Sequence, residues 1–207
     1  LRMSRGLGDV YKRQVLEKNK LDGIDLDFEW AENEKEYKDY SLAILKMREV
    51  LGDKYLFSVS LHPVCYKISK EAIEAVDFIS LQCYGPSPVR FPIEKYCSDI
   101  QMVLEYGIPK EKLVAGVPFY GVTKDNSKKT EAYFNFVQNG LVTSPAQNEV
   151  IYQGDTYVFD GQDNIRIKTR YAKEQKLKGM MSWDLATDLP LSDSRSLLKT
   201  MTEELRE

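Results

Sequence analysis

Three kinds of feature are scarce in this sequence: cysteines, long apolar runs and net charge. The three cysteines, Cys65, Cys83 and Cys97, are spaced irregularly, so they form neither a disulfide framework nor a zinc motif, and we expect mostly buried thiols. No apolar run is long enough to span a membrane, and no secretion signal is visible. The net charge is only −3, with acids and bases interspersed, which gives no indication of a nucleic-acid or membrane partner.

Length and composition fit one globular domain. A chain of 207 residues with 43% apolar residues can bury a good core. The aromatic content, 13 Tyr, 8 Phe and 2 Trp, is compatible with carbohydrate binding but also with core packing. Residues 1–13 show no periodicity and begin with Leu1 rather than Met, so we interpret them as a non-native leader or artefact. The domain is expected over 14–207.

From residue 14 onward, predicted strands alternate with predicted helices. The end of a helix is expected over 14–19. Strands are expected over 21–29, 55–62, 77–84, 112–120 and 178–184. Helices are expected over 33–51, 69–75, 93–106, 164–176 and 193–206. Between these units, 121–163 is interpreted as irregular, with a helix near 130–138, a hairpin of strands 149–153 and 156–160, and Asp163 as an N-cap.

This alternation predicts an α/β fold with a parallel sheet covered by helices. Five strands do not close an eight-stranded barrel, so two architectures remain. The sheet is either open or a truncated (β/α)8 barrel with about strands four to eight present. The acids on the first strand favour the barrel, because inward positions converge there and catalytic groups lie at the carboxyl ends of strands.

The segment 21–29 is the most informative part of the chain. Because strand side chains alternate between faces, one face carries three acids and the other three large apolar groups, in the order Ile24, Asp25, Leu26, Asp27, Phe28, Glu29. The apolar face predicts a layer of helices. The acidic face must line a cavity, where crowded carboxylates move one another's pKa values apart. This pattern favours acid catalysis, with a carboxylate metal site as the alternative.

These residues also resemble a known family. Leu21–Glu29 resembles the Asp-Gly-x-Asp-x-Asp-x-Glu signature of glycoside hydrolase family 18, the chitinases and endo-β-N-acetylglucosaminidases. Three later segments resemble its sixth, seventh and eighth strands: Gln82-Cys83-Tyr84, Gly116 to Gly121, and Gly179 to Asp184 with Asp188 beyond. The resemblance covers about 14–207 and implies that the first three barrel strands are absent.

The resemblance implies a role for each acid. Glu29 would protonate the glycosidic oxygen and later act as a base toward water. The N-acetyl group of the substrate would be the nucleophile, so no second carboxylate is required. Asp27 would bind the acetamide N–H, and Asp25, one step deeper, would share a proton with Asp27. Tyr84 would hydrogen-bond the acetamide oxygen.

The resemblance also implies a binding surface for the sugar. Trp183 would form the floor under the reacting ring. Gln82 and Tyr120 would contact substrate, with core packing as the alternative, and Trp30 would hold the next sugar or simply pack. His62, the sole histidine, ends a predicted strand and is interpreted as structural or superficial, with lining of the cleft as the alternative. Met180 and Met181 are interpreted as core.

Three departures from the family pattern bear on substrate handling. Gly85 stands where many members have Asp, and Val122 stands where the family often has Arg. The stretch between the last two strands is interpreted as too short for an inserted α+β lobe. We therefore expect a shallow, open groove suited to endo action.

Together these features predict a retaining glycoside hydrolase acting on β-1,4-linked N-acetylglucosamine in chitin or chito-oligosaccharides. The alternatives are an endo-β-N-acetylglucosaminidase acting on N-glycans and a chitinase-like protein that binds sugar without turnover. No metal or cofactor is expected. We expect a monomer when full length, located outside the cell, in the periplasm or at the cell surface, and an inactive, aggregation-prone chain if three strands are missing.

Overall fold

The computed structural model describes residues 13–84, 91–125 and 129–206, and a parallel sheet organises them. Its strands are β1 (Gly23–Asp27), β2 (Leu56–Leu61), β3 (Phe78–Leu81), β4 (Leu113–Pro118) and β9 (Gly179–Trp183). They pair in the order β1-β2-β3-β4-β9, and every neighbouring pair is parallel. The predicted parallel arrangement of five strands is confirmed. The domain boundary near residue 14 is not tested, because 1–12 lie outside the described residues.

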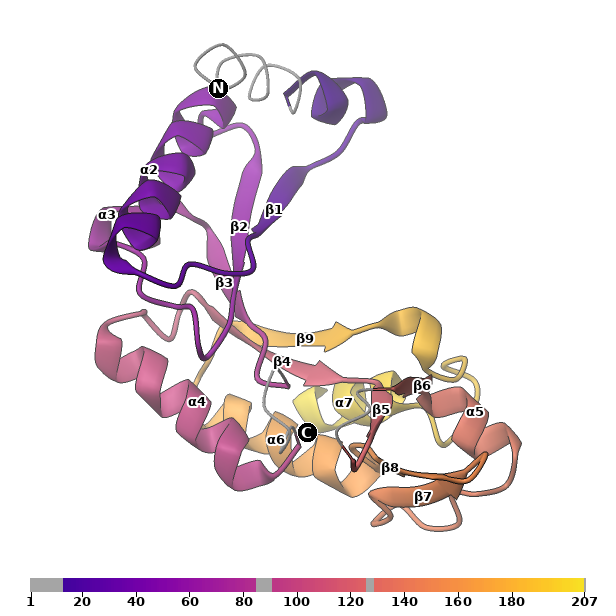
Figure 1. Ribbon diagram of the computed structural model, residues 1–207. Coiled ribbons are helices and arrows are strands. Elements are labelled where there is room, and N and C mark those ends of the chain that lie inside the picture. Colours follow the sequence, from indigo (N-terminus) through magenta and orange to yellow (C-terminus); the bar gives the residue numbers. More distant parts are fainter. Residues whose placement is uncertain (1–12, 85–90, 126–128, 207) are drawn as a thin grey trace.

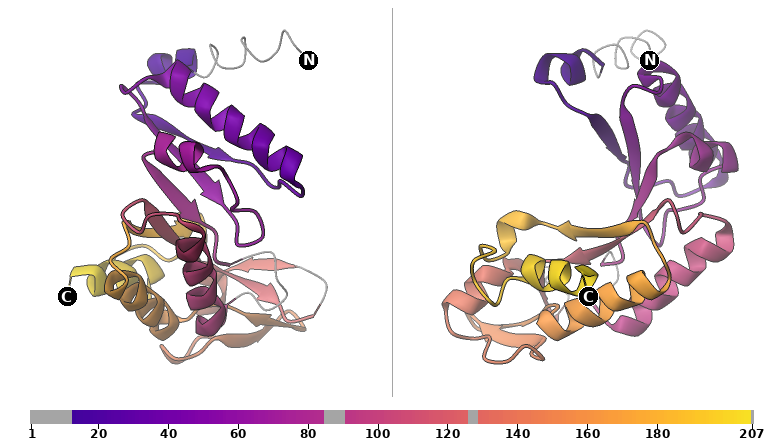
Figure 2. Two further views of the ribbon diagram at one scale, coloured as in Figure 1. Left: turned by 90° about the vertical axis from the view of Figure 1, so that its left-hand side faces the viewer. Right: turned by 180° about the vertical axis from the view of Figure 1, so that it is seen from behind.

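Helices cover the outer side of this sheet. They are α2 (Glu34–Leu51), α3 (Lys70–Ala75), α4 (Ile93–Tyr106), α6 (Gln162–Glu174) and α7 (Leu197–Arg206), and a further helix over 13–19 precedes β1. Figures 1 and 2 show the sheet curving from β1 to β9, with helices such as α2, α3, α4 and α6 on its convex side and the 13–19 helix beyond the start of β1. The core lies between the two layers, where residues such as Phe57, Ile79 and Ile100 are fully buried. No helix among the described residues is long and apolar enough to cross a membrane.

Helix α2 begins and ends where its sequence predicts. The Asn33 side chain accepts a hydrogen bond from the Glu36 backbone N–H at 3.1 Å, and Glu36 accepts one from the Glu32 N–H at 2.7 Å. These bonds satisfy backbone donors that a helix N-terminus leaves without intrahelical partners. Gly52 ends the helix with a positive φ of 60°. The apolar face that includes Ile44 and Leu51 is buried against the sheet.

We expect Asn33→Ala to lower the free energy of unfolding by about 1 kcal/mol, because the Glu36 N–H loses its partner. Urea unfolding measures this change. Asn33→Ser, which keeps an acceptor oxygen, is the control and should lose far less. Equal losses for the two variants would contradict a capping role.

The stretch after β4 folds into a small lobe. The predicted hairpin and the helix near 130–138 are confirmed, whereas two further strands and the four-stranded sheet that they complete were not predicted. A four-stranded antiparallel sheet forms in the order β6-β5-β8-β7, from Tyr120–Thr123 (β5), Thr130–Ala132 (β6), Glu149–Tyr152 (β7) and Asp155–Val158 (β8). Helix α5 (Tyr133–Gln138) packs against it through Phe136, which is fully buried among aromatic rings. The stretch is therefore long enough for an α+β unit, contrary to the prediction, and this unit is seen at the lower right of Figure 1.

Several predicted boundaries also differ. The parallel strands are shorter than predicted, and β1 ends at Asp27 because its pairing with β2 stops at the Asp27–Ser60 pair. Helix α6 is capped by Gly161, whereas Asp163 lies in its first turn and pairs with Arg166. Helices α5 and α7 begin at Tyr133 and Leu197, later than predicted. In the hairpin, the strands are joined at Gln153-Gly154.

The cysteines agree with expectation. All three are free thiols; Cys65 and Cys83 are buried, and Cys97 is half-buried.

Candidate active site

A cavity of about 880 Å³ lies at the carboxyl edge of the parallel sheet. In a sheet of β/α units this edge is where functional groups gather. All eight site residues proposed from the sequence line this cavity: Asp25, Asp27, Glu29, Trp30, Gln82, Tyr84, Tyr120 and Trp183. Residues that are 158 positions apart in the chain, Asp25 and Trp183 (183 − 25), thus contribute to one site.

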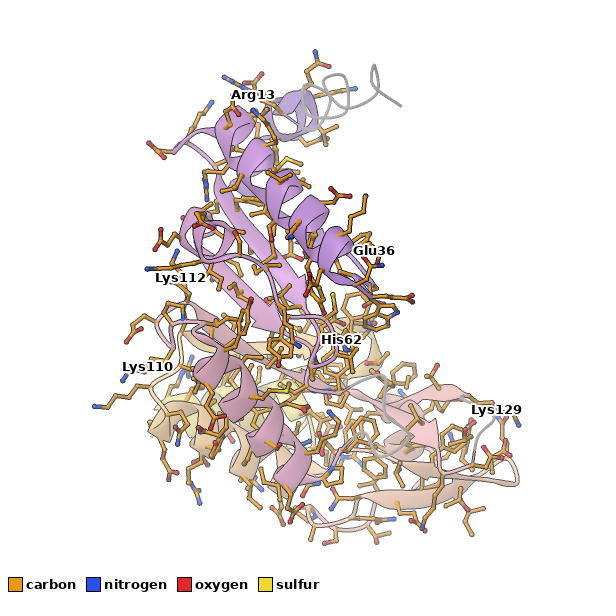
Figure 3. The ribbon with its side chains drawn as sticks, turned by 60° about the vertical axis from the view of Figure 1, so that its left-hand side comes forward. Arg13, Glu36, His62, Lys110, Lys112 and Lys129 are labelled. Carbon is orange, nitrogen blue, oxygen red and sulfur yellow. The ribbon has the colours of Figure 1, made fainter. Side chains whose placement is uncertain are left out.

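The strand ends position these side chains. Glu29 and Trp30 follow β1, and Gln82 and Tyr84 follow β3. Tyr120 follows the end of β4, and Trp183 is the last residue of β9. Lys112 precedes β4, and Figure 3 shows it well apart from His62, which follows β2. The two labels thus mark opposite ends of the sheet.

Gln82 joins the two acids at the centre of the site. Its Nε2 donates to Asp27 Oδ1 and to Glu29 Oε1, each at 3.2 Å. Its Oε1 accepts a hydrogen bond from the Tyr84 hydroxyl at 3.3 Å. Because the phenol can donate here, the amide is oriented with its nitrogen toward the carboxylates. Gln82 is 9% exposed, so it is a fixed part of the cavity wall.

Crowding of carboxylates changes the titration of Asp27. Partial burial raises the pKa of Asp27, the charges of Glu29 and Asp25 raise it further, and the hydrogen bond from Gln82 opposes the increase. Asp27 therefore holds a proton more readily than an ordinary aspartate. The sequence predicted this kind of repulsion among the three acids.

We expect Asp27→Asn to stabilise the fold at neutral pH. The folded-state pKa of Asp27 is raised, so its stabilising contribution is present below the ordinary pKa and is lost as pH rises through the folded value. An asparagine does not ionise, so the Asp27→Asn variant does not lose this stability, and the asparagine side chain has nearly the same shape as that of aspartate. The gain in Tm should appear near pH ~7 and shrink toward zero near pH ~3. Thermal unfolding at both values measures it, and an equal gain at both would contradict the raised pKa.

Asp25 differs from its predicted place. It is exposed in this structure rather than buried, and its carboxylate accepts hydrogen bonds from Ser58 and, at 2.8 Å, from Ser60. Both serines lie on β2, directly opposite the acids in the β1–β2 register. Two hydroxyl donors from the neighbouring strand thus hold the Asp25 carboxylate in place.

Tyr84 is a buried polar group of the site, only 5% exposed. Burial, more than the nearby Tyr120 and acids, raises its pKa well above that of a free phenol, so the hydroxyl stays protonated. The ring lies beside Gly116 of β4, where an added Cβ would lie 3.0 Å from Tyr84 Cε1 and 2.6 Å from the Leu81 carbonyl oxygen. Gly116 therefore leaves room for this ring.

Aromatic rings form the remaining walls. Trp183 is 57% exposed, which is unusual for so large an apolar side chain and suits a binding surface. Tyr120 meets Tyr84 edge to face, with ring centroids 6.3 Å apart. Trp30 contacts His62 in the same geometry at 4.3 Å. An indole or phenol surface can stack on the apolar face of a sugar ring.

The sequence analysis missed three serines of the cavity lining, Ser58, Ser60 and Ser80. His62 is 5% exposed and also lines the cavity, which was the alternative to its preferred structural or surface role. Met181 was predicted to be core, but it lines the cavity and its sulfur accepts from the Tyr84 hydroxyl at 3.9 Å. The missed signal is spacing, because Ser58, Ser60 and His62 repeat the period of two shown by the acids.

Asp188, which the family resemblance included, has a different task. Its carboxylate accepts hydrogen bonds from the Leu197 and Leu198 backbone N–H groups and from the Ser196 hydroxyl. It therefore caps helix α7 and lies outside the cavity lining. Within the part of the chain that the structure describes, no group of three or more His, Cys, Asp or Glu side chains is arranged to hold a metal ion. The chemistry offered by the cavity is proton transfer by a carboxyl group beside an aromatic binding surface.

Comparison with known proteins agrees with this chemistry. Residues 11–188 match the profile of a family described as Glycosyl hydrolases family 18. Probable chitinase 2 of Drosophila melanogaster is 23% identical over 237 aligned residues, which cover 84% of this chain and 49% of that protein. The chain thus spans about half the length of this relative.

Solved structures support the fold. A mutant class V chitinase from Nicotiana tobaccum in complex with NAG4 has a TM-score of 0.79 at 16% identity, covering 99% of this chain and 74% of that one. A chitinase-like agglutinin from Robinia pseudoacacia has a TM-score of 0.74 at 20% identity, covering 93% of this chain and 70% of that one. The five β/α units are therefore part of a (β/α)8 barrel, and the prediction of a truncated barrel is confirmed.

Proposed function

The chain belongs to glycosyl hydrolase family 18, and from this premise we propose that the protein hydrolyses β-1,4-linked N-acetylglucosamine chains with retention of configuration. Chitin and chito-oligosaccharides are the proposed substrates. The observation that carries the proposal is the pair of 3.2 Å hydrogen bonds by which Gln82 joins Glu29 and Asp27 within one aromatic-lined cavity. An acid and a partner carboxylate are thereby held side by side.

Glu29 is the proposed general acid. In the first step its proton passes to the glycosidic oxygen, the bond from that oxygen to the anomeric carbon breaks, and the acetamide oxygen of the substrate bonds to that carbon. An oxazolinium ion results. In the second step the Glu29 carboxylate takes a proton from water, and the water oxygen bonds to the anomeric carbon. The bond from that carbon to the acetamide oxygen breaks, which opens the oxazolinium ring and restores the acetamide. Two inversions at the anomeric carbon give net retention.

The other residues serve the acetamide group. Asp27 accepts its N–H and stabilises the positive charge of the oxazolinium ion, while the Tyr84 hydroxyl donates to the attacking oxygen. The pKa of Asp27 is raised, in part by the charge of Asp25. This supports a proton shared between Asp27 and Asp25 in the free site. Trp183 stacks under the reacting sugar, and Gln82, Tyr120 and Trp30 contact the substrate around it.

A second candidate is sugar binding without turnover. The Robinia agglutinin is described as chitinase-like, and a similar fold therefore occurs in an agglutinin. The intact acid at Glu29, bonded to Gln82, favours turnover. Cleavage of the N-glycan core is the nearest enzymatic alternative. We further propose that the protein acts outside the cell, in the periplasm or at the cell surface, where such polymers are found.

The test is hydrolysis of tetra-N-acetylchitotetraose, run on this chain and on the longest natural polypeptide that contains it. We expect shorter N-acetylated products, with the anomeric configuration at the new reducing end retained when followed by NMR. The fully deacetylated tetramer is the matched control and should stay intact, because it lacks the internal nucleophile. Cleavage of both tetramers would contradict substrate assistance, and binding without any cleavage would support the agglutinin candidate. Activity that survives EDTA argues against a metal-dependent reaction.

A further inference from the structure

His62 lies in the wall of the cavity, at the carboxyl end of β2 and close to the proposed acid. Its side chain is 5% exposed, and its Nε2 lies 3.9 Å from Glu29 Oε1. This separation is too long for a direct hydrogen bond but within the range of an ion pair. Figure 3 shows His62 between the upper and lower parts of the molecule, on the side toward Glu36 of α2.

Two contacts connect the turn that holds His62 to the loop that holds Glu29. His62 and Cys65 exchange backbone hydrogen bonds of 3.2 and 2.8 Å, which fix the turn. The Cys65 sulfur then accepts the Ala31 backbone N–H at 3.1 Å, and the Trp30 ring meets the His62 imidazole edge to face at 4.3 Å. The imidazole and the acid therefore belong to one connected unit.

The acid itself needs such support. The Glu29 side chain is 42% exposed, and a long exposed side chain has several rotamers available. Gln82 and His62 both approach the same oxygen, Oε1, at 3.2 and 3.9 Å. Among the described residues, Oε2 has no hydrogen-bond partner, so this oxygen is available to exchange the catalytic proton. Two neighbours on one oxygen select the rotamer that directs the other toward the substrate.

We propose that His62 is a positioning residue that orients the carboxyl group of Glu29 for proton transfer to the leaving group. The inference rests on the proposed function, because it assigns Glu29 as the acid. It concerns orientation, and it therefore predicts a loss confined to reactions in which the leaving group must be protonated.

The kinetic test compares two substitutions on two substrates. His62→Leu removes the ring nitrogens, whereas His62→Gln retains a polar nitrogen near the place of Nε2. For tetra-N-acetylchitotetraose we expect His62→Leu to lower kcat by about 10–100-fold with KM nearly unchanged, and His62→Gln to recover most of the rate. A 2,4-dinitrophenyl chitobioside, whose phenolate departs without protonation, should lose less than about 3-fold. Equal losses on both substrates would overturn the proposal in favour of a structural role.

A second measurement does not depend on turnover. His62 is the sole histidine, so its imidazole NMR signals are assigned without ambiguity. The titratable neighbours named by the contacts are Glu29 on the loop after β1 and Cys65 on the turn. Glu29→Gln removes the anion, and the midpoint of the imidazole titration should fall by about 0.5 pH unit or more.

The control for this titration is Glu203→Gln, which makes the same change on an exposed position of α7. It should leave the midpoint unchanged. A midpoint that does not respond to Glu29→Gln would overturn the proposed contact. If the unsubstituted protein cleaves neither substrate, the proposed function fails while the titration still decides whether His62 and Glu29 interact.

Discussion

Glu29→Gln is expected to lower the rate of tetra-N-acetylchitotetraose hydrolysis by about 10²–10⁴-fold, the range associated with loss of a general acid. The amide cannot donate the proton that the leaving oxygen needs. It keeps the length of the side chain, and its oxygen can still accept the hydrogen bond from Gln82. Binding should therefore change little, and the loss should lie in kcat. Steady-state kinetics and calorimetric binding of the same tetramer separate the two terms.

Glu203→Gln is the matched control for this prediction. Glu203 is exposed on α7 and does not line the cavity, so the same change of charge there should leave kcat within about 2-fold. If Glu29→Gln keeps the rate of the unsubstituted protein, Glu29 is not the acid and the assignment of the site is wrong. If Glu29→Gln abolishes binding as well as turnover, its main contribution is to substrate affinity.

Much of the site could be predicted because its residues follow the period of a strand. Asp25 and Asp27 lie on β1 opposite Ser58 and Ser60 of β2, and Ser60 lies opposite Ser80 of β3. Glu29, His62 and Gln82 come two residues after Asp27, Ser60 and Ser80, respectively, and line the cavity together. Alternation along a strand is a local property of the chain and is visible in the sequence. The order of strands and helices then predicts that the carboxyl ends of the strands converge.

The antiparallel lobe was predicted only in part: the β7–β8 hairpin and helix α5 were expected, but the pairing of β5 with β6 and β8 was not. Its strands β5 and β8 pair residues that are far apart, such as Val122 with Val158. In the sequence, Tyr120 continues the run of β4 without an obvious break, so one strand was predicted where two occur. Pairing between distant segments depends on the packing of Phe136 and its aromatic neighbours, which no short-range pattern reveals.

The burial of Lys168 on α6 also could not be predicted from the sequence. Lys168 is 2% exposed, and its Nζ lies 2.5 Å from Asp160 Oδ2, which is itself buried. The ammonium group also lies 5.9 Å from the ring of Phe91 and 5.5 Å from that of Tyr96. A lysine on an amphipathic helix is ordinarily solvated, so sequence periodicity alone assigns it to the surface. Asp160 lies just before α6 and Lys168 lies on it. This helix packs against β4 and β9; Tyr120 follows the end of β4, and Trp183 is the last residue of β9.

Lys168→Met is therefore expected to lower the free energy of unfolding by about 3–5 kcal/mol at neutral pH, as removal of one partner of a buried ion pair generally does. The Asp160 carboxylate would remain buried, with Asn164 at 3.1 Å as its remaining side-chain donor among the described residues. Burial already raises the pKa of Asp160, and Lys168 opposes that increase, so its removal raises the pKa further. Protonated Asp160 stabilises the folded state at low pH. This contribution is lost as the pH rises through the raised pKa of Asp160 in the folded state. The deficit should therefore shrink in acid.

Urea unfolding near pH ~7 and pH ~4 measures both the loss and its pH dependence. Lys173→Met, on an exposed position of the same helix, is the control and should change stability by no more than about 0.5 kcal/mol. Combining Lys168→Met with Asp160→Asn should recover much of the loss, because the buried anion is removed together with its partner. A double variant as unstable as Lys168→Met alone would show that packing of the lysine stem, rather than the unpaired carboxylate, causes the loss.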